Sequence, residues 1–420
     1  MFGGRPDRNM VSAEKGLPEK FDESGLKWAA ALGNETYGNP VIAGGRVFIG
    51  TNNGAPRDPK IKGDKGVLMC FAEKNGDFLW QAVHDKLPTG EREDWPKIGI
   101  CSTPAVAGDR VYYVSNRAEL VCRAAADGKL VWLLDMKKDL GVLPHQASAA
   151  SPLVADGLVF VNTGHGADGE TAKVKNPEAP SFLAVDAASG KIAWKDASPG
   201  ARIMAGQWAS PAYGVVDGKP QVCFPGGDGW LYAFEAATGK PLWKLNGKAH
   251  EKPKPDGEPE TPNHFVATPV YAGHRILIAS GADPEAGNSP GCLRAVDARG
   301  GAELWARSRE AFGCSISSVA VHDGLVYAPE LSGVLHCLEL ETGKPVWSHD
   351  LLSAIWGSPM VADGKIYLRN EDGEVVVMKA GREKKLLATN ELPGLAHGTV
   401  TAANGALYVA GGTKLYVIGK

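Results

Sequence analysis

Residues 181–194 read SFLAVDAASGKIAW, and residues 229–243 read GWLYAFEAATGKPLW. Both stretches begin with an apolar alternating run, turn at a Gly and close a second short run with Trp, which is the pattern of a β-hairpin. Six segments of this form occur along the chain, and they end at Trp80, Trp132, Trp194, Trp243, Trp305 and Trp347. The Trp therefore marks a fixed position in a repeated structural unit.

A second hairpin, with two apolar strands around a Gly turn, lies upstream of these segments. The upstream hairpins number eight and begin near Pro40, Pro104, Pro152, Pro211, Pro269, Ser318, Pro359 and Val400. Each unit thus has four strands, named A to D in chain order. A four-stranded sheet cannot bury both faces alone, so the units must stack, and closing them into a ring leaves few exposed edges. The sequence predicts an all-β fold, an eight-bladed β-propeller of four-stranded antiparallel blades.

The two ends of the chain carry complementary fragments of one unit. The last unit, residues 397–420, stops after its third strand. Residues 25–32 (GLKWAAAL) are an outer strand with a Trp but without a unit of their own. We expect residues 26–32 to complete the eighth blade as its strand D, which closes the ring without a covalent bond. Residues 26–420 would then form a single propeller domain.

Two segments depart from the repeat. Residues 1–25 precede the first strand, and we expect them to form an extended N-terminal arm bound to the surface. Residues 374–388 (EVVVMKAGREKKLLA) occupy the place of a C–D hairpin but lack the closing Trp. Because that Trp is expected to pack between blades, the sequence predicts weaker packing beside blade 7.

The composition argues against several classes of partner. The 45 Lys and Arg residues nearly balance the 48 Asp and Glu residues, for a net charge of −3, so no long-range field attracts nucleic acid or an anionic membrane. No apolar run reaches the roughly 18 residues that a membrane span requires. The seven cysteines form no CxxC or CxxCH motif, so neither a disulfide framework, a structural zinc site nor an attached haem is indicated. We expect a monomer that binds no nucleic acid and has no membrane span.

The signature A-x-D-A-x-x-G-K-x-x-W, seen at residues 184–194 and nearly at residues 233–243, resembles the docking repeat of pyrroloquinoline-quinone (PQQ) type propellers. That family includes the quinoprotein alcohol dehydrogenases and the lipoprotein propeller that helps to assemble outer-membrane proteins. The stretches at residues 1–9, 37–53 and 220–234 are similar to exported PQQ-like propellers of planctomycete-type bacteria. The resemblance implies a periplasmic or otherwise exported protein. The chain opens with MFGGRPDRNM, so an export signal would lie outside this sequence.

The connections between strands are unequal in length. The A–B and C–D turns are short, whereas the long segments all fall in the B–C and D–A connections. In a propeller these two sets lie on opposite faces. Binding groups concentrate on loops that a rigid scaffold holds, so the B–C/D–A face is the predicted functional face.

Six residues are candidates for a site at the mouth of the central channel on that face. They are Trp208, Trp356, His145, His264, His397 and Gln207. Both Trp residues occupy the same A-strand position in their blades, and such a ring could stack on a planar quinone, a sugar or a partner side chain, or plug the channel. The His residues lie near the starts of innermost strands and could act as a general base, a hydrogen-bond partner or a metal ligand. The sequence assigns no metal.

Two functions remain open. The first is a non-catalytic binding or scaffold protein, which offers the loop-rich face to a protein or glycan partner in the cell envelope. The alternative is a quinoprotein dehydrogenase with PQQ and Ca²⁺ at the channel mouth, for which Asp283 is the candidate base by position alone. The chain lacks the adjacent Cys pair and the haem motif found in many of these enzymes. The scaffold is therefore the predicted function, with no cofactor assigned.

Overall fold

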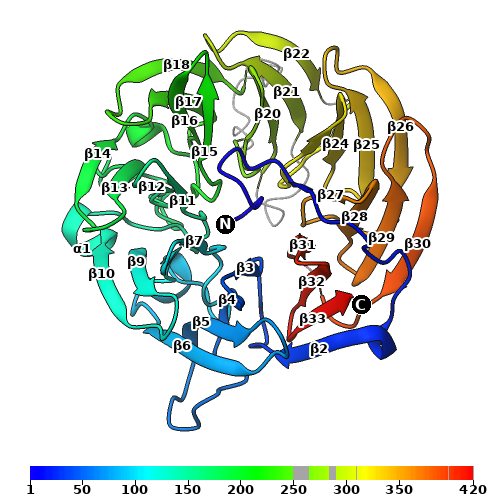
Figure 1. Ribbon diagram of the computed structural model, residues 1–420. Helices are drawn as coiled ribbons and strands as arrows, with labels where there is room; N and C mark the ends of the chain where they lie inside the picture. Colours follow the sequence, from blue (N-terminus) through cyan, green and yellow to red (C-terminus); the bar gives the residue numbers. More distant parts are fainter. Residues whose placement is uncertain (249–263, 283–289, 309, 396, 420) are drawn as a thin grey trace.

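The computed structural model describes residues 1–248, 264–282, 290–308, 310–395 and 397–419. These residues form eight blades of four antiparallel strands arranged around a central axis (Figure 1), and one blade has the short strand β1 (Val11–Ser12) as a fifth, parallel strand. The predicted eight-bladed propeller is confirmed. Among the described residues, no helix is long and apolar enough to span a membrane.

Blades 1 to 4 follow one another along the chain, each with strand A innermost and strand D outermost. Blade 1 comprises β3 (Val41–Ala43), β4 (Arg46–Asn52), β5 (Lys65–Ala72) and β6 (Phe78–Asp85), and blade 2 comprises β7 (Ala105–Ala107), β8 (Arg110–Val114), β9 (Glu119–Ala124) and β10 (Leu130–Asp135). Blade 3 comprises β11 (Leu153–Ala155), β12 (Leu158–Asn162), β13 (Phe182–Asp186) and β14 (Ile192–Asp196), and blade 4 comprises β15 (Ala212–Val216), β16 (Lys219–Pro225), β17 (Trp230–Glu235) and β18 (Pro241–Asn246).

Blades 5 to 8 complete the ring. Blade 5 comprises β19 (Val270–Ala272), β20 (Arg275–Ser280), β21 (Cys292–Asp297) and β22 (Glu303–Ser308), and blade 6 comprises β23 (Ala320–His322), β24 (Leu325–Pro329), β25 (Val334–Glu339) and β26 (Pro345–Asp350). Blade 7 comprises β27 (Met360–Ala362), β28 (Lys365–Arg369), β29 (Glu374–Lys379) and β30 (Leu386–Glu391), and blade 8 comprises β31 (Thr401–Ala403), β32 (Ala406–Gly411), β33 (Lys414–Gly419) and β2 (Leu26–Ala31). The remaining elements are β1 (Val11–Ser12), the helix α1 (Met136–Leu140) and three single 3₁₀ turns, η1 (Glu23–Gly25), η2 (Gly90–Arg92) and η3 (Gly200–Arg202).

The ring closes through an N-terminal strand. Strand β2 pairs antiparallel with β33, and Ala31 lies opposite Lys414 at the end of the pair. The main-chain amide of Leu32 donates to the carbonyl of Thr413 one residue further on, at 2.8 Å. In Figure 1, β2 lies along the outer edge of the blade that contains the C-terminus. The predicted completion of the last blade by residues from the other end of the chain is therefore confirmed.

Each repeated Trp joins its blade to the next one. The indole of Trp194 in blade 3 donates a hydrogen bond to the carbonyl of Ala236 in blade 4, at 2.9 Å. Its ring covers Gly239, where an added Cβ would lie 2.6 Å from the indole. The same stacking recurs in the pairs Trp28–Gly76, Trp80–Gly128, Trp132–Gly190, Trp243–Gly301 and Trp305–Gly343. The Gly of the repeat is needed both for its left-handed turn conformation and for the space that the Trp fills.

The junction between blades 7 and 8 has no Trp, and the N-terminal arm packs there instead. The register places Ala388 opposite Val377, where Trp347 lies opposite Cys337 in blade 6. The amide of Phe21 in the arm donates to Asn390 of β30 at 2.8 Å. Buried Leu17 and partly buried Phe21 belong to the same apolar cluster as Ala388. The missing Trp thus does not leave the junction open.

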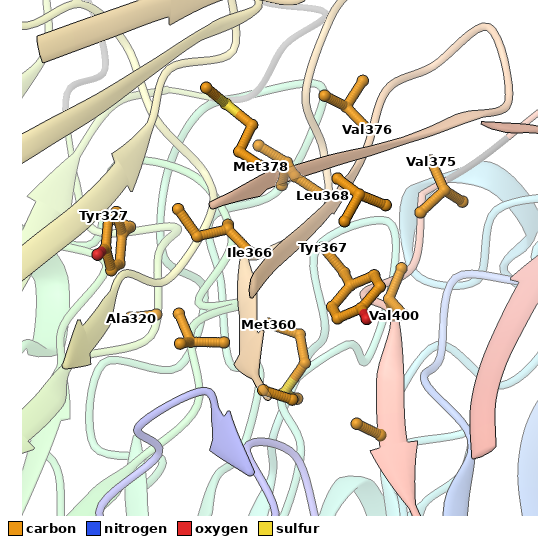
Figure 2. Close-up of a cluster of buried hydrophobic side chains, with 14 of the residues drawn as sticks. Ala320, Tyr327, Met360, Ile366, Tyr367, Leu368, Val375, Val376, Met378 and Val400 are labelled. Carbon is orange, nitrogen blue, oxygen red and sulfur yellow. The ribbon is translucent and has the colours of Figure 1, made fainter. Parts of the chain in front are cut away.

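Blade 7 shares its core with both neighbours. Consecutive residues of a strand point to opposite faces of the sheet. Figure 2 shows this alternation in β28, where Ile366 lies toward Tyr327 of blade 6 and Tyr367 lies toward Val400 of blade 8. The stacked blades therefore form a continuous apolar layer here.

The arm does not lie on the surface as expected from the sequence. Arg8, Met10 and Leu17 are 0%, 1% and 3% exposed. Strand β1 pairs in parallel with β27, the innermost strand of blade 7, so the arm runs inside the ring. Figure 1 shows the N-terminus near the central axis. The expectation failed because the groups of the propeller that hold the arm are main-chain amides and carbonyls, which leave no mark in the side-chain pattern.

The packing of Trp194 on Gly239 predicts the outcome of a matched pair of substitutions in blade 4. Gly239 and Gly218 have φ values of +71° and +74°, but no atom lies within 4 Å of an added Cβ at Gly218. We expect Gly218→Ala to lower the free energy of unfolding by about 1 kcal/mol, through backbone strain alone. Gly239→Ala should cost about 2–4 kcal/mol, because overpacking against the indole is added. Chemical denaturation of the two variants measures the difference, and equal losses would contradict the proposed blade junction.

Candidate functional site

The central channel opens on the B–C/D–A face as a funnel of about 320 Å³. Two rings of side chains line it, and each ring takes one residue from every blade. The outer ring, at the mouth, consists of Tyr37, Cys101, Ala149, Trp208, Val266, Ile316, Trp356 and His397. The inner ring consists of Asn39, Thr103, Ser151, Ser210, Thr268, Ser318, Ser358 and Thr399. Phe2 of the arm lines the funnel too, and it also borders a second cavity of about 290 Å³.

The inner ring carries a circuit of hydrogen bonds that links seven of the eight pairs of neighbouring blades, and among the described residues no such bond joins Thr268 to Ser318. The amide of Ser151 donates to the hydroxyl of Ser210 at 2.8 Å, and the amide of Ser210 donates to the hydroxyl of Thr268 at 3.1 Å. The other such bonds run from Asn39 to Thr103, Thr103 to Ser151, Ser318 to Ser358, Ser358 to Thr399 and Thr399 to Asn39. In the described chain, the hydroxyl of Ser318 is the inner-ring oxygen without a partner. The circuit joins the inner edges of neighbouring blades.

Trp208 forms one wall of the mouth together with two His residues. Its indole ring lies 5.8 Å from the ring of His145 and 5.9 Å from the ring of His264, measured between centroids. The indole N–H donates to the carbonyl of His145 at 3.2 Å. The His145 Nδ1 lies 2.6 Å from the carbonyl oxygen of Ala167. Three of the predicted site residues are therefore neighbours, although His145 and His264 do not line the funnel itself.

Trp356 and His397 form the opposite wall. Their rings meet edge to face, with centroids 4.8 Å apart. The other side of His397 stacks on Tyr37, at 4.5 Å and an interplanar angle of 16°. Neither Trp356 Nε1 nor His397 Nδ1 has a hydrogen-bond partner in the described chain. Burial, assisted by the charge of Arg369, lowers the pKa of His397 and favours its neutral form.

The side chain of Gln207 is turned into the wall between blades 3 and 4. Its amide nitrogen donates to the carbonyl of His165 at 2.7 Å and to Ser181 at 3.0 Å. Its carbonyl oxygen accepts from the amide of Gly227 at 3.1 Å. All of these partners belong to the fold, so Gln207 braces the wall that carries Trp208. Asp283 lies outside the described residues.

His264 is buried without hydrogen bonds to its ring. The residue is 1% exposed, and neither ring nitrogen has a partner in the described part of the chain. Burial, with smaller contributions from Lys248 and His145, lowers the pKa of His264 to about 4. The ring is therefore neutral at pH 7 and contributes an uncharged surface behind Trp208.

The funnel does not fit PQQ and Ca²⁺. Ca²⁺ prefers carboxylate and amide oxygens, and the quinone carries three carboxylates that call for cationic partners. Of the described residues that line the funnel, none is Asp, Glu, Lys or Arg. Across the described chain, no group of three His, Cys, Asp or Glu side chains is placed to hold a metal ion. The walls are suited to an uncharged, apolar or aromatic group instead.

Sequence reasoning missed part of the lining. Trp95 and Ile98, from the connection between blades 1 and 2, and Phe2, from the arm, all border the funnel. The sequence does contain a pattern that locates the outer ring, because each of its members lies two residues before a member of the inner ring. Six inner-ring residues directly precede a Pro that starts an A–B hairpin. No comparable signal marks Phe2, which is brought in by the path of the arm.

The repeat and the fold agree with a known family. A family model described as outer membrane protein assembly factor BamB matches residues 64–283 and 289–417, which is more than half of the chain. The chain belongs to the BamB family. The resemblance to PQQ-type propellers seen in the sequence is therefore confirmed at the level of family.

Individual BamB relatives are distant. BamB from Shewanella oneidensis is 24% identical over 376 residues, which cover 87% of this chain and 76% of that protein. The crystal structure of BamB from Moraxella catarrhalis has a TM-score of 0.63 at 16% identity and covers 93% of this chain and 98% of its own. A europium-containing methanol dehydrogenase has a TM-score of 0.69 at 12% identity, with 100% and 97% of the two chains covered. At these identities the two solved structures establish a shared fold alone.

The hydrogen bonds of the inner ring predict that Ser→Ala substitutions at two equivalent positions differ in their effect on stability. Ser210→Ala removes the acceptor of a buried amide, which should lower the free energy of unfolding by about 1–3 kcal/mol. Ser318→Ala removes a hydroxyl without a partner in the described chain, so its effect should stay within about 0.5 kcal/mol. Chemical denaturation compares the two variants. A loss at Ser318 equal to that at Ser210 would show that the circuit does not hold the ring.

His264 predicts a loss of stability in acid. Its pKa is about 4 in the folded chain and near 6.5 when unfolded, so between these values the unfolded chain binds more protons. Stability should therefore fall as the pH drops from 6.5 to 4, by about 3 kcal/mol in total. His264→Asn removes this contribution, and denaturation curves for the two proteins at a series of pH values measure the difference. Parallel pH profiles would contradict the neutral, buried state of His264.

Proposed function

We propose that this protein is a non-catalytic scaffold that binds a protein partner of the outer membrane assembly machinery through its B–C/D–A face. Membership of the BamB family supports the class of function, because its relatives are named as outer membrane protein assembly factors. The ring supplies a rigid frame, and the long connections supply the surface. A rigid frame lets a partner bind with little loss of conformational entropy.

The observation that carries the proposal is a pair of exposed Leu side chains on two of the connections that lead to the mouth of the funnel. Trp356 and His397 line the funnel, and the D–A connections that carry them also hold Leu352 and Leu395. Leu352 is 87% exposed and Leu395 is 60% exposed. Large apolar side chains in such positions beside an aromatic pocket are typical of the centre of a protein interface. The uncharged walls select an apolar anchor from the partner.

We further propose the location of the protein, its oligomeric state and the chemical class of its partner. We place the protein in the periplasm or in another exported location, since its relatives assemble outer membrane proteins. We propose that it acts as a monomer. We propose a protein rather than a glycan as the partner, because the exposed side chains of Leu352 and Leu395 provide no hydrogen bonds for sugar hydroxyls.

The quinoprotein alternative has less support. A likeness to dehydrogenase structures at 12% identity concerns the fold. The described lining of the funnel offers neither a carboxylate for Ca²⁺ nor a cation for the quinone carboxylates. Addition of PQQ and Ca²⁺ to the purified protein should therefore leave the absorbance of PQQ unchanged and produce no dye reduction with alcohols.

Site-specific photo-crosslinking in the native cell envelope tests the proposed face. A photoreactive amino acid at Leu352 or Leu395 should give adducts with a component of the outer membrane assembly machinery. Val215 is a matched control, because it is 59% exposed but lies next to the A–B turn of blade 4, on the opposite face. Leu352→Asp and Leu395→Asp together should weaken binding of the captured protein at least tenfold, with unchanged thermal stability.

Two results would contradict the proposal. Adducts at Val215 but not at Leu352 or Leu395 would place the interface on the other face. Adducts at the Leu positions with polysaccharide alone would make the partner a glycan.

A further inference from the structure

The N-terminal arm binds the inner edges of four consecutive blades. The amide of Tyr213 in blade 4 donates to the carbonyl of Pro6 at 2.9 Å, and the amide of Tyr271 in blade 5 donates to the carbonyl of Asp7 at 3.0 Å. Blades 6 and 7 add Val321, which exchanges two hydrogen bonds with the side chain of Asn9, and Val361, whose amide donates to the carbonyl of Met10. The four amides occupy the same position in strand A of their blades. The arm therefore moves from blade to blade by one or two residues at a time.

This contact has the form of a bound extended peptide. Val11 and Ser12 pair in parallel with Val361 and Ala362, which adds a strand to the inner edge of blade 7. Addition of a strand to an exposed sheet edge is a common mode of peptide recognition, in which main-chain bonds give affinity and side-chain pockets give specificity. Here the edges belong to the propeller, and the peptide belongs to the arm.

Arg8 supplies the specificity. Its side chain is completely buried and meets four carbonyl oxygens. The guanidinium donates through Nε to Pro211 at 2.8 Å, through Nη1 to Phe2 at 3.1 Å, and through Nη2 to Ser151 at 3.0 Å and Pro152 at 3.2 Å. Three of these oxygens belong to the propeller, at the starts of the innermost strands of blades 3 and 4. A lysine has a single nitrogen and cannot reach acceptors spread around a planar fork.

We infer that the inner edges of blades 4 to 7 form an arginine-selective binding site for an extended peptide, and that residues 5–12 occupy this site in cis. The carbonyl cage between blades 3 and 4 sets the register of the peptide. The amides of blades 4, 5 and 7 hold its main chain, and blade 6 pairs with the side chain of Asn9. A segment with an Arg in the same place and an extended run after it fits the same site. This inference is independent of the partner proposed for the opposite end of the channel.

The site is tested by cutting the arm after the protein has folded. Lys15 and Gly16 are exposed and follow β1, so a specific protease site placed there and cut after folding releases residues 1–15 from the main chain. Size exclusion followed by native mass spectrometry then measures how much of the fragment stays bound. A labelled synthetic peptide of residues 1–13, added to the cut protein, measures exchange into the site.

The variants Arg8→Lys and Arg5→Lys are a matched pair in both measurements. Arg5 is exposed, and its guanidinium pairs with Asp7 of the arm itself. We expect the wild-type and Arg5→Lys fragments to be retained and their peptides to exchange in. The Arg8→Lys fragment should be lost on the column, and its peptide should bind at least tenfold more weakly. Equal affinity of the Arg8→Lys and wild-type peptides, or loss of the wild-type fragment without rebinding, would overturn the inference.

Discussion

The whole architecture depends on the pairing of β2 with β33. Eight wedge-shaped sheets can share their apolar faces only if the ring is complete, and no covalent bond joins β33, at one end of the chain, to β2, near the other. The strand pair carries Trp28 into position over Gly76 of blade 1. It also holds blade 8 where the amide of Thr399 meets the side chain of Asn39. Without this closure, the circuit of the inner ring and the funnel above it would open.

Much of this could be predicted from the sequence, because the repeated signals have simple physical causes. The Gly before each Trp is required by a turn with positive φ and by the indole stacked on it, so the pair recurs in blade after blade. The path of the arm could not be predicted. Arg8 is a residue type that is rarely buried, and the carbonyls that surround it have no signature in the sequence. The site was predicted only in part, because Trp208 and Trp356 face the channel while Gln207 faces the wall.

The candidate site owes its character to the outer ring, where equivalent positions of the repeat carry different residue types. The inner ring consists mainly of Ser and Thr, since each blade must supply a small acceptor to its neighbour. The outer ring carries no such constraint, and its members range from Ala149 to Trp356. Within this chain the frame thus recurs from blade to blade while the residues at the mouth differ, and fold alone does not determine function. The described lining of the mouth carries no charged side chain, which is consistent with a scaffold and offers an anionic cofactor no cationic partner there.

The closure of the ring is tested most directly by a disulfide between its two ends. Ala31 and Lys414 are opposite one another, next to the hydrogen-bonded pair of Leu32 and Thr413, so they are the closely spaced kind of pair that accepts a disulfide. A chain with Cys at both positions should form this bond on oxidation. Because the bond closes a loop of nearly the whole chain, it should raise the free energy of unfolding by about 5 kcal/mol over the reduced form. Failure of the bond to form, or no gain in stability when it does, would contradict the closed ring.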